Sequence, residues 1–116
     1  MNKKKEFNYI INKKLMQIRI SLYTLDLVFE DDIIITSGYR LKYIEEGNTV
    51  FEWQNSEKPL FSINNLLDIP IQKVFIDKSS NLILEFFNKC TLLIMADQSE
   101  GESYMIFNHH DFDSFP

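Results

Sequence analysis

Residues 25 to 33 read Leu-Asp-Leu-Val-Phe-Glu-Asp-Asp-Ile, and residues 82 to 90 read Leu-Ile-Leu-Glu-Phe-Phe-Asn-Lys-Cys. In both stretches apolar residues recur at every second position, a break follows, and the apolar pattern then resumes. Alternation with a period of two is typical of a half-buried β-strand, and the break is typical of a tight turn. Each stretch therefore predicts a strand, a turn and the start of a returning strand.

A second alternating run precedes each stretch, with the apolar residues Leu15, Ile18 and Ile20 in one case and Ile71, Val74 and Ile76 in the other. The chain thus contains an internal repeat of about 56 residues, and a copy of that size cannot bury its own apolar face. We expect a single domain, residues 1–116, in which copies at about 14–54 and 70–107 share one core.

The composition favours strands over long helices, since Ala96 is the only alanine while Ile, Phe, Tyr, Thr and Val are plentiful. The predicted fold is mainly β (α+β), with two antiparallel modules packed as a sandwich or a partly open barrel. In the connector, residues 55–69, the spacing of Leu60, Ile63 and Leu67 predicts one short helix near residues 59–68, ended by Pro70.

The ends of the chain give weaker patterns. Residues 1–6 and 108–116 are expected to be flexible termini, with docking of the tail through Phe112 and Phe115 as the open alternative. Residues 7–14 fit either a first strand or a short helix.

Charge is unevenly distributed along the chain. Residues 1–14 carry five lysines and one glutamate, a net of +4, so the total of −5 leaves −9 for residues 15–116. The last twenty residues hold five acidic residues and no Lys or Arg, which disfavours nucleic acid as the partner of that surface. A basic protein is the natural complement.

Several features indicate a soluble, cytoplasmic protein that does not enter a membrane. Cys90 is the only cysteine, which fits a reducing compartment. The lysine-rich start resembles that of a signal peptide, but Asn8, Asn12, Lys13 and Lys14 interrupt the apolar stretch that such a segment needs.

No pattern in the chain carries the chemistry of catalysis, and we expect neither an enzyme nor a cofactor. His109 and His110 are adjacent, so on an extended segment they point to opposite faces and make a poor metal site. Cys90 lies among strand hydrophobes and is interpreted as a buried structural thiol.

Three predicted turns or loops concentrate carboxylates: Glu30, Asp31 and Asp32; Glu45 and Glu46; and Asp97, Glu100 and Glu102. If these segments lie at one rim, their summed field raises the association rate of a basic protein by about 10-fold to 1000-fold. Ordinary solvated loops are an equally good interpretation. The N-terminal lysines fit contact with nucleic acid or anionic lipid, a solubilising end, which is the commoner explanation, or a segment that docks on the acidic body of the chain itself.

The two quoted stretches resemble a signature found in a family of small bacterial two-repeat domains of unknown function, in which Leu-x-Leu-x-Phe precedes an acidic residue or Asn, a turn and an apolar residue. The resemblance covers about residues 14–107. It extends to a later motif matched by Glu102, Ser103, Tyr104 and Ile106, but Gly101 stands where that motif has its first aromatic residue.

Domains of this family resemble the immunity partners of polymorphic or contact-dependent growth inhibition toxins. The resemblance implies an immunity protein that occludes the active site of a cognate, basic, nuclease-type toxin domain. Its partner-binding residues would be the eight carboxylates of the acidic segments.

Two other classes of function stay open. One is a small-ligand carrier or sensor with a pocket lined by Tyr39, Tyr43, Phe51 and Trp53. The other is a homodimeric structural module formed by pairing of edge strands. The sequence leaves the choice between monomer and homodimer undetermined.

Overall fold

The computed structural model describes residues 7–21, 23–54, 65–96, 104–107 and 112–115, without the side chains of Phe51, Gln54 and residues 112–115. The chain begins with a 3-10 turn, η1 (Asn8–Ile10), and a second, η2 (Glu30–Asp32), joins two strands. The strands are β1 (Leu15–Ile20), β2 (Leu25–Phe29), β3 (Ile33–Ser37), β4 (Arg40–Glu45), β5 (Asn48–Gln54), β6 (Ile71–Ile76), β7 (Leu82–Phe86), β8 (Cys90–Met95), β9 (Tyr104–Phe107) and β10 (Phe112–Phe115).

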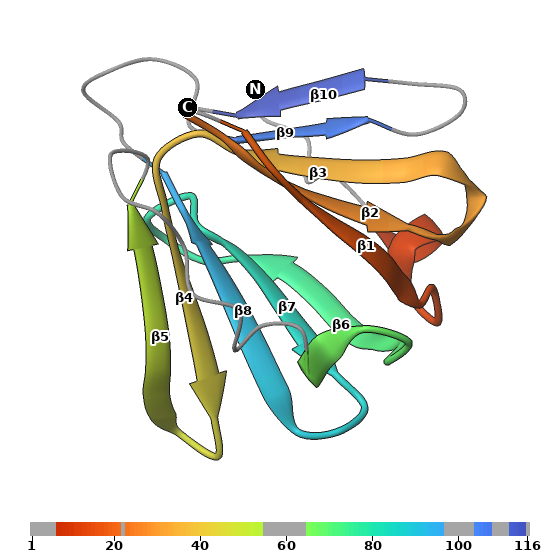
Figure 1. Cartoon of the computed structure of the whole chain (residues 1–116), viewed down its shortest axis with the longest axis vertical. Helices are drawn as coiled ribbons and strands as arrows, with labels where there is room; N and C mark the ends of the chain where they lie inside the picture. The colour runs from red at the N-terminus through yellow and green to blue at the C-terminus, as the bar shows by residue number, and fades with distance from the viewer. Residues whose placement is uncertain (1–6, 22, 55–64, 97–103, 108–111, 116) are drawn as a thin grey trace.

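These strands form two antiparallel five-stranded sheets, which face each other as two layers (Figure 1). The first sheet has the order β1-β2-β3-β9-β10, and the second has the order β5-β4-β8-β7-β6. The fold is therefore mainly β with two antiparallel sheets that do not close into a barrel, and it is consistent with the sandwich that the sequence predicts.

Strand register is the same in the two copies. Leu15 pairs with Phe29 and Ile20 with Leu25, and in the second copy Ile71 pairs with Phe86 and Ile76 with Leu82. Each ribbon has an irregularity at the same place, after Leu15 in β1 and after Ile71 in β6. The two copies thus share the same strand pairing, including one extra residue near the start of the first strand of each ribbon.

The last hairpin of each copy leaves its own sheet. The β4–β5 hairpin follows β3 in the chain but pairs with β8 of the second copy, while the β9–β10 hairpin follows β8 but pairs with β3 of the first copy. The two copies exchange hairpins reciprocally, so each sheet is completed by strands from the other copy.

The two sheets are joined along one side by main-chain hydrogen bonds. The amide of Asn12 donates to the Ile71 carbonyl at 2.7 Å, and the amide of Ile71 donates to the Lys13 carbonyl at 3.1 Å. Lys14 and Pro70, which are equivalent in the two copies, form an antiparallel bridge across this seam. The seam therefore lies where the two copies meet.

The interior is one continuous apolar cluster drawn from both copies. The inward residues of β2 and β7 are fully or almost fully buried, and the largest buried side chains include Trp53, Tyr43, Tyr104, Phe29 and Phe86. Close packing of such large rings leaves each copy dependent on the other for its core.

Two sequence predictions about local structure need correction. No helix of two to three turns is present in the described part of the connector: residues 65 and 66 form a short 3-10 turn and Leu67 bridges to Leu15, while residues 59–64 lie outside the described residues. The reason is tertiary, because the amide of Asp68 donates to the Leu15 carbonyl at 2.7 Å instead of continuing a helix.

The flexible tail is also wrong in part, since Phe112–Phe115 forms β10 and satisfies the main-chain edge of β9. The remaining residues of the two termini, 1–6, 108–111 and 116, lie outside the described residues. The question left open for residues 7–14 is answered by the 3-10 turn η1, which buries Phe7 and Ile10. In the described part of the chain, no helix has the length and apolar character that crossing a membrane requires.

Candidate functional site

The β2–β3 turn carries the first acidic group and takes the form of the 3-10 turn η2. Asp31 and Asp32 have positive φ angles of 63° and 61°, a conformation that Asp tolerates better than most residues. This turn lies at the right-hand end of the first sheet in Figure 1.

Two of its three carboxylates are held by lysines of the same chain. The backbone amide of Lys14 donates to Oε1 of Glu30 at 2.8 Å, and the Glu30 amide donates back to the Lys14 carbonyl at 3.1 Å. The Lys13 ammonium forms an ion pair with Asp31, and that of Lys14 lies 3.4 Å from Oδ1 of Asp68. We call Lys13, Lys14, Glu30, Asp31 and Asp68 the lysine clasp.

Asp32, the third carboxylate of this turn, is not part of the clasp. It is exposed and has no hydrogen bond or ion pair to another described residue. Docking on the acidic body was one of the sequence interpretations of the N-terminal lysines, and the contacts of Lys13 and Lys14 agree with it for this turn. The partners could not be named from the sequence, because they depend on how β1 and β2 pair.

The β4–β5 turn carries the second acidic group. Glu46 and Gly47 form a two-residue turn with φ angles of 50° and 83°, a geometry that the glycine permits and that closes the Glu45–Asn48 pair. Glu46 is exposed. Glu45 is half-buried, and its Oε2 accepts a hydrogen bond from the Tyr43 hydroxyl at 2.6 Å.

The buried Tyr43 hydroxyl makes polar contacts with two residues, of which Glu45 is the first. The Tyr43 hydroxyl also lies 3.4 Å from Sγ of Cys90, the buried free thiol that starts β8. Burial, followed by the hydrogen bonds to Cys90 and Glu45, holds the pKa of Tyr43 far above its ordinary value. The prediction that Cys90 is buried is therefore confirmed.

The acidic segments do not share one rim where the structure describes them. In Figure 1 the β4–β5 turn lies at the bottom of the second sheet, whereas the β2–β3 turn lies at the right-hand end of the first sheet. The third group, Asp97, Glu100 and Glu102, lies outside the described residues. The two described turns consequently present Asp32 and Glu46 as separate charges.

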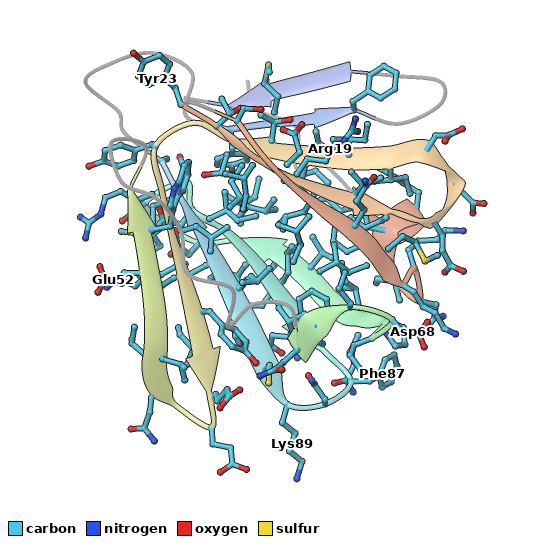
Figure 2. All side chains as sticks on the ribbon, in the orientation of Figure 1. Arg19, Tyr23, Glu52, Asp68, Phe87 and Lys89 are labelled. Carbon is cyan, nitrogen blue, oxygen red and sulfur yellow. The ribbon has the colours of Figure 1, made fainter. Side chains whose placement is uncertain are left out.

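The outer face of the second sheet carries an apolar row in which Phe75, Ile83 and Leu93 are cross-strand neighbours. Phe75 is 41% exposed, and Ile83 and Leu93 are half-buried. Phe87, which follows β7, is 51% exposed and points away from the sandwich in Figure 2. The second sheet therefore carries exposed apolar side chains at Phe75 and Phe87.

The aromatic residues proposed to line a ligand pocket act mainly as core residues. Tyr43 is fully buried and Trp53 is 1% exposed, both packed in the shared apolar cluster. Tyr39 is half-buried, and the side chain of Phe51 lies outside the description. The described residues also contain no group of three or more His, Cys, Asp or Glu side chains placed to hold a metal ion.

Comparison with known proteins finds no matching family model, no matching curated protein and no matching solved structure. The case for any function therefore depends on the strand signature and on the surface of this fold.

Proposed function

We propose that this chain is a non-catalytic inhibitor of the immunity type, which binds a cognate basic toxin domain in the cytoplasm and blocks its active site. The observation that carries the proposal is the exposure of Asp32 and Glu46, neither of which has a hydrogen bond or ion pair to another described residue, in a chain of net charge −5. Exposed carboxylates of this kind steer a cationic protein and fix its orientation.

The β-sandwich suits this role because it holds both turns on a stiff frame. The β2–β3 turn is anchored by the hydrogen bonds between Lys14 and Glu30, and the β4–β5 turn by the hydrogen bond between Tyr43 and Glu45. A rigid binder loses little conformational entropy on association. Of the eight proposed partner-binding residues, Asp32 and Glu46 are the two we expect to matter most among those described.

The test uses the toxin domain encoded beside the gene for this chain, purified and mixed with the full chain in stopped-flow experiments. We expect association to slow strongly between low and high ionic strength, because exposed charges are screened beyond about 8 Å at physiological salt. Asp32→Lys and Glu46→Lys should each lower the association rate by about threefold to tenfold at low salt.

Asp31→Asn and Asp32→Asn form a matched comparison, because each removes one charge from the same turn. Asp31 is already paired with Lys13, so its neutralisation should change the association rate less than Asp32→Asn does. Failure of the toxin domain to bind, or a rate that does not respond to salt, would refute the proposal.

A further inference from the structure

The two sheets have different kinds of edge. β1 and β6 are edge strands whose first residues are joined through the Lys14–Pro70 seam, which occupies their main-chain groups there. At the opposite end of the strand order, β5 closes the second sheet and pairs with β4 alone in the described part of the chain. Figure 1 shows β5 along the left-hand margin of the second sheet.

β5 has the features of a strand that accepts another strand. It is seven residues long, whereas the equivalent edge β10 has four. It contains the strand-favouring residues Thr, Val, Phe and Trp. It has no proline and no lysine, and these two residue types commonly protect an edge strand from pairing. Asn48, Thr49, Val50 and Glu52 are exposed, with Val50 at 47%.

A bulge interrupts β5 near its start but leaves the rest regular. Val50 is the extra residue, since Tyr43 pairs with Phe51 and Ile44 with Thr49. From Phe51 to Gln54 the register with β4 is continuous. The outward main-chain groups of this part can form a regular antiparallel ladder with an added strand.

Charge indicates which strand would be added. Glu52 is the only charged residue of β5, and its Oε1 lies 3.1 Å from Nη2 of Arg40 on β4. Figure 2 shows Glu52 at the outer margin of the second sheet. This ion pair neutralises the charge of the β5 edge. A basic segment would therefore gain little electrostatic attraction from Glu52, and an identical β5 edge would meet little electrostatic repulsion.

Symmetry also favours an identical partner. In an antiparallel pair of the Phe51–Gln54 segments about a two-fold axis, the Glu45–Glu46 turns of the two copies stand at opposite ends of the pair. Seven residues span about 23 Å, well over the Debye length of about 8 Å at physiological salt.

We propose that β5 pairs antiparallel with β5 of a second copy of this chain, which joins the two second sheets into one continuous sheet. The contact is isologous, as in most homodimers, and it covers the longest edge strand in the part of the chain that the structure describes. It does not depend on the proposed inhibitor function, since it requires neither a toxin nor the acidic turns.

The test is sedimentation velocity of the full chain from about 1 μM to about 500 μM, a range suited to a weak, small interface. We expect the mass to rise from that of one chain, 13.8 kDa, towards that of two. Val50→Lys should raise the dimer dissociation constant by at least about 10-fold, because a lysine on the edge opposes strand addition.

Met16→Lys is the matched control, because Met16 is the extra residue of the β1 bulge and is 56% exposed. It should leave the dissociation constant unchanged. Hydrogen exchange supplies a second measurement, in which the amides of Phe51 to Gln54 gain protection as concentration rises. A chain that stays monomeric throughout, equal effects of the two substitutions, or β5 amides insensitive to concentration would each overturn the proposal.

Discussion

Ser37 of β3 lies directly opposite Tyr104 of β9, and this pair replaces the Ile94–Leu41 pair found at the equivalent position of the other sheet. A small residue faces a large one in the first sheet, and two residues of middle size face each other in the second. All four side chains are buried. The exchange of hairpins between the copies is therefore matched by complementary volumes at the point where each hairpin joins its sheet.

This complementarity predicts that residues 37 and 104 are energetically coupled. Ser37→Ile should destabilise the protein by about 1–3 kcal/mol, because it overfills a closed site beside the Tyr104 ring. Tyr104→Leu should cost about 2–4 kcal/mol, since it leaves a cavity and removes the hydrogen bond from the tyrosine hydroxyl to the Ser80 carbonyl, 2.8 Å long. Urea unfolding measures both.

The double variant Ser37→Ile with Tyr104→Leu recreates the Ile94–Leu41 arrangement and should be more stable than the sum of the single effects by about 1 kcal/mol or more. Ser37→Ala is the control. The Ser37 hydroxyl is buried with no hydrogen-bond partner in the described structure, so its removal should leave stability unchanged or raise it by about 1 kcal/mol. Strictly additive single effects would contradict the coupling.

Alkaline pH should destabilise the fold through two tyrosines. Burial raises the pKa of Tyr43, with further contributions from Cys90 and Glu45, and burial followed by the charge of Asp77 raises the pKa of Tyr104. Both phenols bind their proton more tightly when folded than when unfolded, where the pKa is about 10. Their stabilising effect is complete below that value and is lost as pH rises through and beyond it.

Urea midpoints between pH 8 and pH 11 measure this loss. The double variant Tyr43→Phe with Tyr104→Phe should have a lower midpoint at pH 8 but a flatter decline above pH 10. A decline that is equally steep in this variant would assign the effect to other groups.

Neutralising Glu30 should weaken the lysine clasp. Glu30→Gln replaces a carboxylate that accepts the Lys14 amide by a neutral acceptor, with an expected loss of about 1 kcal/mol in the free energy of unfolding. Asp32→Asn, in the same turn and exposed, should change stability by less than about 0.5 kcal/mol. The reverse order of effects would show that the clasp does not stabilise the turn.

The equivalent position in the second copy explains why the clasp is present once. Phe87 stands where Glu30 does, and its amide donates to the Pro70 carbonyl just as that of Glu30 donates to the Lys14 carbonyl. Proline has no amide hydrogen to satisfy, so the second copy needs no carboxylate there. The second copy can therefore carry an exposed apolar side chain, Phe87, at the position where the first copy has Glu30.

Local patterns in the sequence were sufficient for β2 and β7 and for their buried faces. Alternation in residues 25 to 33 and 82 to 90 predicts β2 and β7 with the correct buried sides, and Gly47 beside Glu46 marks the turn that the structure has. These features depend on neighbours along the chain, where a period of two and turn chemistry decide the outcome.

The remaining features depend on contacts between distant segments. The exchange of hairpins pairs β3 with β9 and β4 with β8, and no spacing within the sequence encodes those partners. The predicted helix near Leu67 was replaced by a bridge to Leu15 for the same reason. In the candidate site, the sequence located the carboxylates but not their exposure, because the pairing of Asp31 with Lys13 follows from the seam.

The most direct test of the shared core is to produce the two copies as separate chains, residues 1–60 and residues 61–116. Circular dichroism during urea unfolding then measures whether each fragment folds. Since each sheet is completed by a hairpin from the other copy, neither fragment alone should show a cooperative transition, and an equimolar mixture should regain strand content and unfold in one transition. A fragment that unfolds cooperatively by itself as a monomer would contradict the shared core.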